Sequence, residues 1–137
     1  MKITNWVAGV MALALMASTV YADSSTIPKD QLDKKKIYWG NGESFHKAGK
    51  VDYEKIIKAT PEFKTMKEEK VERGSGKYWI LMSQASDRVV KALAHVGEKS
   101  DYDLICAKGY LTGLDPPVEC DDVTEKVIEA MEELMGD

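Results

Sequence analysis

The chain has 137 residues, with 19 lysines and arginines against 23 aspartates and glutamates, and its formal net charge is −4. This length is typical of a single domain. Because an acidic domain repels phosphate backbones and anionic lipid surfaces, the composition argues against nucleic acid as a partner.

The first 22 residues predict a cleavable signal peptide. Lys2 gives a positive start, residues 7–20 form an uncharged apolar run, and residues 20–22 carry the small side chains that a signal peptidase reads. The apolar run of about 14 residues is shorter than the roughly 20 that a membrane-spanning helix needs. We therefore expect a periplasmic or secreted protein of about 115 residues after cleavage, with no stable membrane insertion.

Residues 23–49 predict an N-terminal arm followed by a loop rich in aromatic residues and glycine. Residues 23–36 are polar and weakly patterned, which favours a flexible or loosely packed arm. Three aromatic side chains flank the glycines further on: Tyr38, Trp39 and Phe45. They either cover a small core or form a binding surface, and covering a core is the commoner role of such side chains.

Residues 50–53 predict a short strand, and a helix is expected soon after it. Thr60 is a good N-cap residue, and Pro61 is tolerated at the first helical position because the N–H that it lacks would have no partner there. Residues 74–76, Gly-Ser-Gly, are expected to end this helix.

The clearest predicted element is a helix over residues 78–96. Its apolar residues recur at spacings of three and four, as on one helical face: Tyr78, Met82, Ala85, Val89, Ala92 and Val96. Four others are expected to widen this face: Trp79, Leu81, Val90 and Leu93. Gly97 is positioned to cap the helix. We expect a hairpin with the preceding helix, and the remaining apolar surface must meet a sheet, another helix or another subunit.

Residues 102–107 alternate in a way that predicts a strand, with Tyr102, Leu104 and Cys106 on one face. A turn at residues 108–109 and a returning strand at residues 110–112 are expected to follow. Asp122 and Glu125 have the spacing of a capping box, which predicts the start of a final helix. The expected inward-facing residues there are Val123, Val127, Ile128, Met131 and Leu134. Together these elements predict an α+β fold: a small sheet with a short helical hairpin and a C-terminal helix.

The two cysteines, Cys106 and Cys120, leave two alternatives. Thiols outside the cytoplasm tend to oxidise, and a disulfide that closes a loop of about 15 residues would stabilise the fold by roughly 3 kcal/mol. The other alternative is two separate thiols, one of them buried in a strand.

No residue pattern points to catalysis, to a metal or to a cofactor. The two histidines, His46 and His95, and the two cysteines are too scattered for a usual zinc site. The sequence also contains neither a nucleophile elbow nor a phosphate-binding glycine loop of the P-loop type. We therefore expect a protein that is not an enzyme and has no cofactor.

Short motifs follow one another along residues 50–134. They are Val51-Asp52, then Lys55-Ile56-Ile57, the Y-D-L-I segment at 102–105 and the D-D-V-T-E-K-V-I segment at 121–128. In this order they resemble the OmpH/Skp family of periplasmic chaperones, in a short-armed form. The resemblance implies that residues 50–137 form the domain, that its sheet body trimerises and that helical arms enclose unfolded outer-membrane proteins. Only about 40 residues separate the sheet segments here, so short arms are expected, and the mature chain is acidic where the family's arms are basic.

The function that this resemblance implies is a periplasmic chaperone-like module that binds unfolded proteins. The resemblance also implies a homo-oligomer, namely a trimer. An alternative is a non-catalytic interaction or scaffold domain that binds one folded partner. The partner would then contact either the aromatic loop at 38–45 or the apolar helix face. The residues of that face that form either a binding surface or a core seam are Tyr78, Trp79, Met82, Ala85 and Val89.

Overall fold

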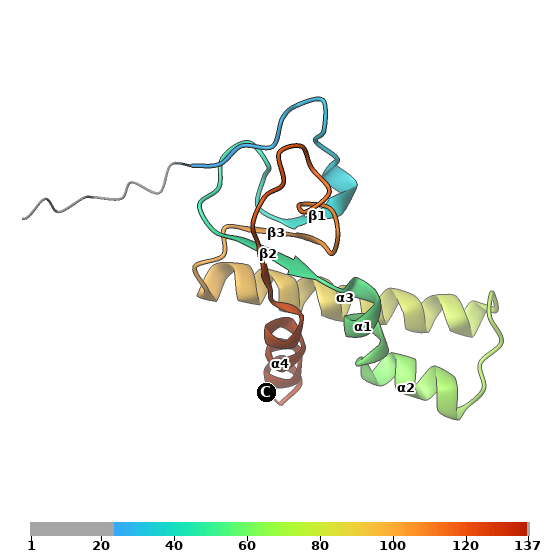
Figure 1. Ribbon diagram of the computed structural model, residues 1–137. Coiled ribbons are helices and arrows are strands. Elements are labelled where there is room, and N and C mark those ends of the chain that lie inside the picture. The colour runs from blue at the N-terminus through green and yellow to red at the C-terminus, as the bar shows by residue number, and fades with distance from the viewer. Residues whose placement is uncertain (1–23, 137) are drawn as a thin grey trace, which may run out of the picture.

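The computed structural model describes residues 24–136, so the predicted signal peptide lies outside the described residues. Figure 1 shows a small sheet with helices below it and long loops above it. The elements in chain order are η1 (Lys34–Lys36), β1 (Ile37–Trp39), β2 (Ala48–Val51), α1 (Tyr53–Lys58), α2 (Pro61–Glu68), α3 (Gly76–Lys99), β3 (Leu104–Ala107), β4 (Asp121–Asp122) and α4 (Thr124–Met135). The predicted α+β fold is confirmed.

The sheet is mixed and has the strand order β1-β3-β2-β4. β3 pairs with β1 in the antiparallel sense and with β2 in the parallel sense, and β2 pairs with β4 in the parallel sense. The predicted returning strand at residues 110–112 is wrong, because those residues form turns. β3 already has a strand on each side, so a hairpin partner has no free edge to join. The chain instead crosses to the far side of β2, where it forms β4.

The sheet separates two apolar clusters. The cluster on the helical face joins Val51 and Ile105 to the inward sides of α1, α3 and α4. The other cluster lies under the loops and includes Leu104, Cys106 and Phe45. Tyr102 belongs to the helical cluster, so its expected place beside Leu104 and Cys106 is wrong. β3 begins only at Leu104, and the alternation of a strand does not extend to a residue that precedes it.

The N-terminal segment is part of this body rather than a loose arm. Ile27 is only 2% exposed, and Ser25 pairs with Phe45 in an isolated antiparallel bridge. The Gln31 side chain donates a hydrogen bond to the Asp115 carbonyl at 2.9 Å. The expectation of a loosely packed arm is therefore wrong for residues 24–36, and the expected boundary at residue 50 falls inside β2.

The helical hairpin forms as expected, with different ends. The Thr60 hydroxyl accepts a hydrogen bond from the Phe63 N–H, which confirms the predicted N-cap. α2 stops at Glu68, well before residues 74–76, because Lys70 adopts a left-handed conformation (φ 51°). The Val71 N–H then donates to the Met66 carbonyl at 2.9 Å, which closes the end of the helix as in a Schellman motif.

α3 is longer than predicted, from Gly76 to Lys99. Gly97 lies within it and is not a cap, because the helix is capped at Ser100. A Cβ atom at Gly97 would lie 2.2 Å from the indole of Trp39, so the glycine provides room for that side chain against the helix. This contact ties β1 to the C-terminal half of α3.

Of the residues expected to face inward at this end of the chain, Val123, Val127 and Met131 are buried and Ile128 is half-buried. α4 also buries Thr124 and Ala130, which the sequence analysis did not single out. Leu134 was expected inward and is exposed, because the last turn of α4 extends beyond the apolar cluster. The predicted capping box is also wrong. Asp122 accepts hydrogen bonds from the N–H and hydroxyl of Thr124, and Glu125 pairs with Lys55 of α1 instead of closing back on its own helix.

Candidate interaction surface

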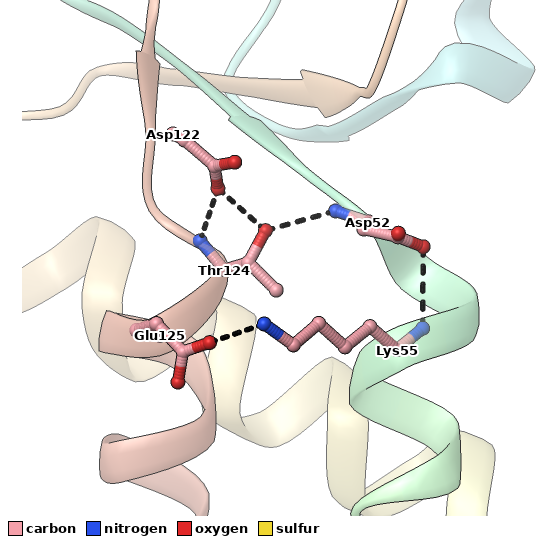
Figure 2. A network of polar contacts seen from close by, with 5 residues as sticks. All are labelled: Asp52, Lys55, Asp122, Thr124 and Glu125. Carbon is pink, nitrogen blue, oxygen red and sulfur yellow. Dashed lines mark hydrogen bonds and ion pairs between the residues drawn. The ribbon is translucent and has the colours of Figure 1, made fainter.

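Three of the four short motifs, at residues 51–52, 55–57 and 121–128, converge where the parallel strands β2 and β4 end and their helices begin. Figure 2 shows the hydroxyl of Thr124 between the Asp122 carboxylate, 2.6 Å away, and the backbone N–H of Asp52, 3.0 Å away. The carboxylate of Asp52 in turn accepts from the Lys55 N–H and so caps α1. One buried hydroxyl thus fixes the start of α4 against the start of α1.

The charges around this hydroxyl follow from the same contacts. The two hydrogen bonds that Thr124 donates lower the pKa of Asp122 below its ordinary value. Lys55 and Glu125 form an ion pair at the surface, a kind that usually contributes little to stability. Every polar group in Figure 2 has a partner within the group. The contacts of Asp52, Lys55, Thr124 and Glu125 therefore position α1 and α4 at this end of the sheet.

The part of the chain that the structure describes contains no group of three or more His, Cys, Asp or Glu side chains placed to hold a metal ion. His46 binds Asp103 with its ring Nδ1 at 3.1 Å, and the backbone N–H groups of His46 and Lys47 donate to the same carboxylate. These bonds fasten the chain before β2 to the chain before β3. His95 lies apart, on the outer side of α3.

The predicted apolar face of the long helix divides into a core and a surface. Ala85 and Val89 are fully buried, and Tyr78 and Met82 are half-buried. Trp79, expected to widen this face, is 64% exposed. Successive helical residues are about 100° apart, so Trp79 is rotated away from the stripe that meets the sheet.

The first turns of α3 expose two consecutive large apolar side chains, because Ile80 beside Trp79 is 61% exposed. We name these two residues the tip pair. They lie next to the loop that joins α2 to α3, at the end of the hairpin most distant from the sheet (Figure 1). The sequence analysis did not single out Ile80. An apolar residue on the polar side of a helical wheel indicates an exposed apolar side chain, so its position could have identified it.

The hairpin holds the tip pair on a firm support. The Ser75 hydroxyl accepts from the Tyr78 N–H and caps α3, and the Tyr78 ring meets the Trp79 ring edge to face at 5.2 Å. Further along, Arg88 of α3 donates three hydrogen bonds to the Glu62 carboxylate of α2, at 2.7 to 3.2 Å. The hydrogen bonds from Arg88 lower the pKa of Glu62 below its ordinary value. This partly buried ion pair joins the two helices.

A shallow groove of about 790 Å³, which this ion pair helps to line, follows the outer side of α3 between α2 and α4. Charged side chains dominate its lining, including Asp87, Lys91 and Glu98, and Leu134 borders it at the end of α4. The tip pair, in contrast, exposes two large side chains that carry no charge.

The three aromatic residues of the 38–45 segment do not form one surface. Tyr38 and Trp39 pack against the helical cluster, and Phe45 is buried in the cluster under the loops, on the other face of the sheet. Burial raises the pKa of Tyr38, whose ring centroid lies 5.4 Å from that of Tyr53. The two alternatives for these aromatic side chains were a cover over a core and a binding surface. Their burial agrees with the first, because all three pack against a core.

Both cysteines are free thiols, which agrees with the second of the two alternatives. Cys106 is buried in β3, and Cys120 is partly buried against the same cluster. Burial raises the pKa of the Cys106 thiol to about 12, which keeps it protonated at ordinary pH.

Among the described residues, no helix is both long enough and apolar enough to cross a membrane. The chain was also compared with protein-family models, with curated proteins and with solved structures, and no match was found in any of the three comparisons.

Proposed function

We propose that this protein is a periplasmic chaperone-like module that binds unfolded apolar segments at the tip of a short helical hairpin. The observation that carries the proposal is the tip pair, Trp79 and Ile80, which exposes more than 60% of each side chain at the projecting end of the hairpin. Large apolar side chains exposed side by side are typical of surfaces that bind another chain.

The support beneath the tip pair favours this function. The Arg88–Glu62 pair and the Ser75 cap hold the hairpin in one geometry, so little conformational freedom is lost when a ligand binds there. Tryptophan contributes a large contact area with few rotatable bonds, which suits contact with many different sequences.

The resemblance to the OmpH/Skp family points in the same direction. Three of its four motifs lie where the sheet meets α1 and α4, and the Y-D-L-I motif runs into β3, so they would preserve the sheet body while the arms vary in length. α2 has eight residues and α3 has 24, which correspond to lengths of about 12 and 36 Å. Arms this short favour contact with a short segment of an unfolded chain rather than enclosure of a whole protein.

An assay of aggregation tests this function. A urea-unfolded outer-membrane β-barrel protein is diluted into buffer with the mature protein in molar excess, and light scattering is followed. The expected result is slower scattering with the wild type, and loss of the effect with the double variant Trp79→Ser, Ile80→Ser. The matched control is Leu134→Ser, Met135→Ser, because these residues are also consecutive, apolar and exposed but lie at the end of α4.

Two outcomes would reject the proposal. Scattering that is unchanged at molar excess of the wild type would exclude a holding activity, and equal loss in the control variant would remove the role of the tip. Circular dichroism of both double variants should match the wild type, because all four side chains are exposed. Sedimentation of the wild type gives the oligomeric state, and a trimer would support the family resemblance.

The alternative, an interaction domain for one folded partner, is favoured by the small extent of exposed apolar surface. Among the described residues only five large apolar side chains are exposed: Trp79, Ile80, Val90, Leu134 and Met135. The same aggregation assay separates the two functions, because a domain specific for one folded partner leaves the scattering of an unfolded β-barrel protein unchanged.

A further inference from the structure

We propose that the free edge of β1 binds an extended acidic segment of another protein by strand addition. β1 lies at the end of the strand order and pairs only with β3. The outer side of an edge strand carries backbone N–H and C=O groups that can pair with an added strand. This surface lies apart from the tip pair, so the inference does not depend on the proposed chaperone function.

Two hollows flank the free edge, one on each face of the sheet. The hollow on the helical face has a volume of about 350 Å³ and is lined by Ile37, Tyr38, Tyr53, Val90 and Leu93. The hollow on the loop face has a volume of about 270 Å³. Ile37 borders both of them. Because successive side chains of a strand point to opposite faces, a strand added to β1 places alternate side chains into the two hollows.

The two hollows differ in chemistry. On the helical face the lining is apolar and aromatic, and it includes Val90, whose side chain is 57% exposed. On the loop face Lys34 and Glu43 both line the hollow, together with Leu32 and the turn at residues 40–42. The edge therefore suits a segment in which apolar side chains alternate with polar ones.

Charge selects an acidic segment. Lys34, Lys35 and Lys36 form η1 directly before β1, all three are exposed, and none takes part in an ion pair with a described residue. The nearby acidic groups are Glu43 in the hollow and Asp33, whose carboxylate accepts from the Lys35 N–H and keeps its negative charge. Three unpaired lysines outweigh these two carboxylates, in a chain whose net charge is −4.

Lysine on an edge strand often serves to prevent pairing with other chains. Here the lysines precede the strand, and β1 itself consists of Ile37, Tyr38 and Trp39. These residue types favour strand pairing and carry no charge that would block it. The lysines are therefore placed to attract a charged segment toward an edge that can pair with it.

A binding assay with a designed peptide tests this inference. The probe is a fluorescein-labelled peptide of about nine residues that alternates Glu with Val or Phe, a length typical of a strand. We expect saturable binding by fluorescence anisotropy, weakened by added salt, and slower hydrogen exchange of backbone amides in β1. A peptide with the same sequence but N-methylated at alternate residues lacks the donors for strand pairing and should bind at least tenfold more weakly.

Variants of the protein test the charge. Replacing the three lysines at 34–36 with Gln should weaken binding by about tenfold, since each exposed pair contributes a few tenths to one kcal/mol. The matched control replaces Lys64, Lys67 and Lys70 with Gln, because these lysines are also exposed but belong to the α2 region. Binding in the control should stay within about twofold of the wild type.

Three results would overturn the inference. One is equal affinity for the N-methylated peptide, and another is equal or higher affinity for a peptide with Lys in place of Glu. The third is a self-associated protein in sedimentation experiments that the peptide dissociates, because a second copy of the chain would then occupy the edge. None of these results bears on the aggregation assay of the tip pair, so the two proposals fail separately.

Discussion

Replacing Thr124 with valine is the sharpest test of the contacts that join α1 to α4. Valine matches threonine in shape and lacks the hydroxyl that accepts from the Asp52 N–H and donates to the Asp122 carboxylate. Thr124 is 3% exposed, so water does not readily replace these partners. An unsatisfied N–H costs about 1–3 kcal/mol, and a hydrogen bond to a charged group contributes about 1.5–3 kcal/mol. Because the added methyl group offsets part of this loss, we expect a decrease of about 3 kcal/mol in the free energy of unfolding.

Thermal and urea unfolding, followed by circular dichroism, measure this effect. For a domain of this size a loss of about 3 kcal/mol lowers Tm by about 12 °C. Thr124→Ser is the control, because it keeps the hydroxyl and should lose only about 1 kcal/mol for the missing methyl group. A valine variant as stable as the serine variant would refute the role given to the hydroxyl.

The pH dependence of the same variant gives an independent check. The hydrogen bonds from Thr124 lower the pKa of Asp122 in the folded protein. The stability that they contribute is therefore fully present above the pKa of an unfolded aspartate, about 3.9, and is lost as pH falls through the lower folded value. The stability difference between wild type and Thr124→Val should narrow below about pH 3.9, and a difference that stays constant down to pH 2 would contradict this assignment.

Three further predictions concern the core. Val89→Asp places an unpaired carboxylate on the fully buried face of α3 and should cost several kcal/mol; a Tm within the scatter of repeated wild-type scans would show that the face is not buried. Gly97→Ala should destabilise despite the higher helix propensity of alanine, because its Cβ meets the Trp39 indole, and the cost should shrink in a Trp39→Leu background. In native protein at pH 8, iodoacetamide should label Cys120 far ahead of Cys106, because burial raises the pKa of Cys106 to about 12. Equal labelling rates, measured by peptide mass spectrometry, would be incompatible with a buried Cys106 thiol.

The proposed site was only partly accessible from the sequence. Periodicity identified the long helix and its buried residues Ala85 and Val89, because a core-facing stripe repeats at helical spacing. It also assigned Trp79 and Val90 to that stripe, although both are exposed. Each of the two directly follows a stripe residue and is therefore rotated by about 100° from it. How much of that flank the sheet and the neighbouring helices cover is decided by the tertiary structure, and a local pattern does not contain that information.

The strands, too, were only partly predictable from the sequence. Residues 102–107 have a pattern that predicts a strand, and β3 lies within them. Nothing in residues 110–112 shows that β1 and β2 already occupy both sides of β3, or that the chain will cross to pair beyond β2. Strand pairing joins residues that are far apart in the chain, so it was decided only when the whole sheet formed.

The sequence by itself determined the α+β class, the cap at Thr60 and the position of the long helix, because these depend on hydrogen bonds and side-chain spacing among near neighbours. Only the tertiary structure decided that Gly97 makes room for Trp39, that Thr124 joins two helices and that two hollows flank the edge of β1. Each of these features is a contact between segments separated by tens of residues. The geometry of such contacts is fixed by close packing in three dimensions, and no single stretch of sequence specifies it.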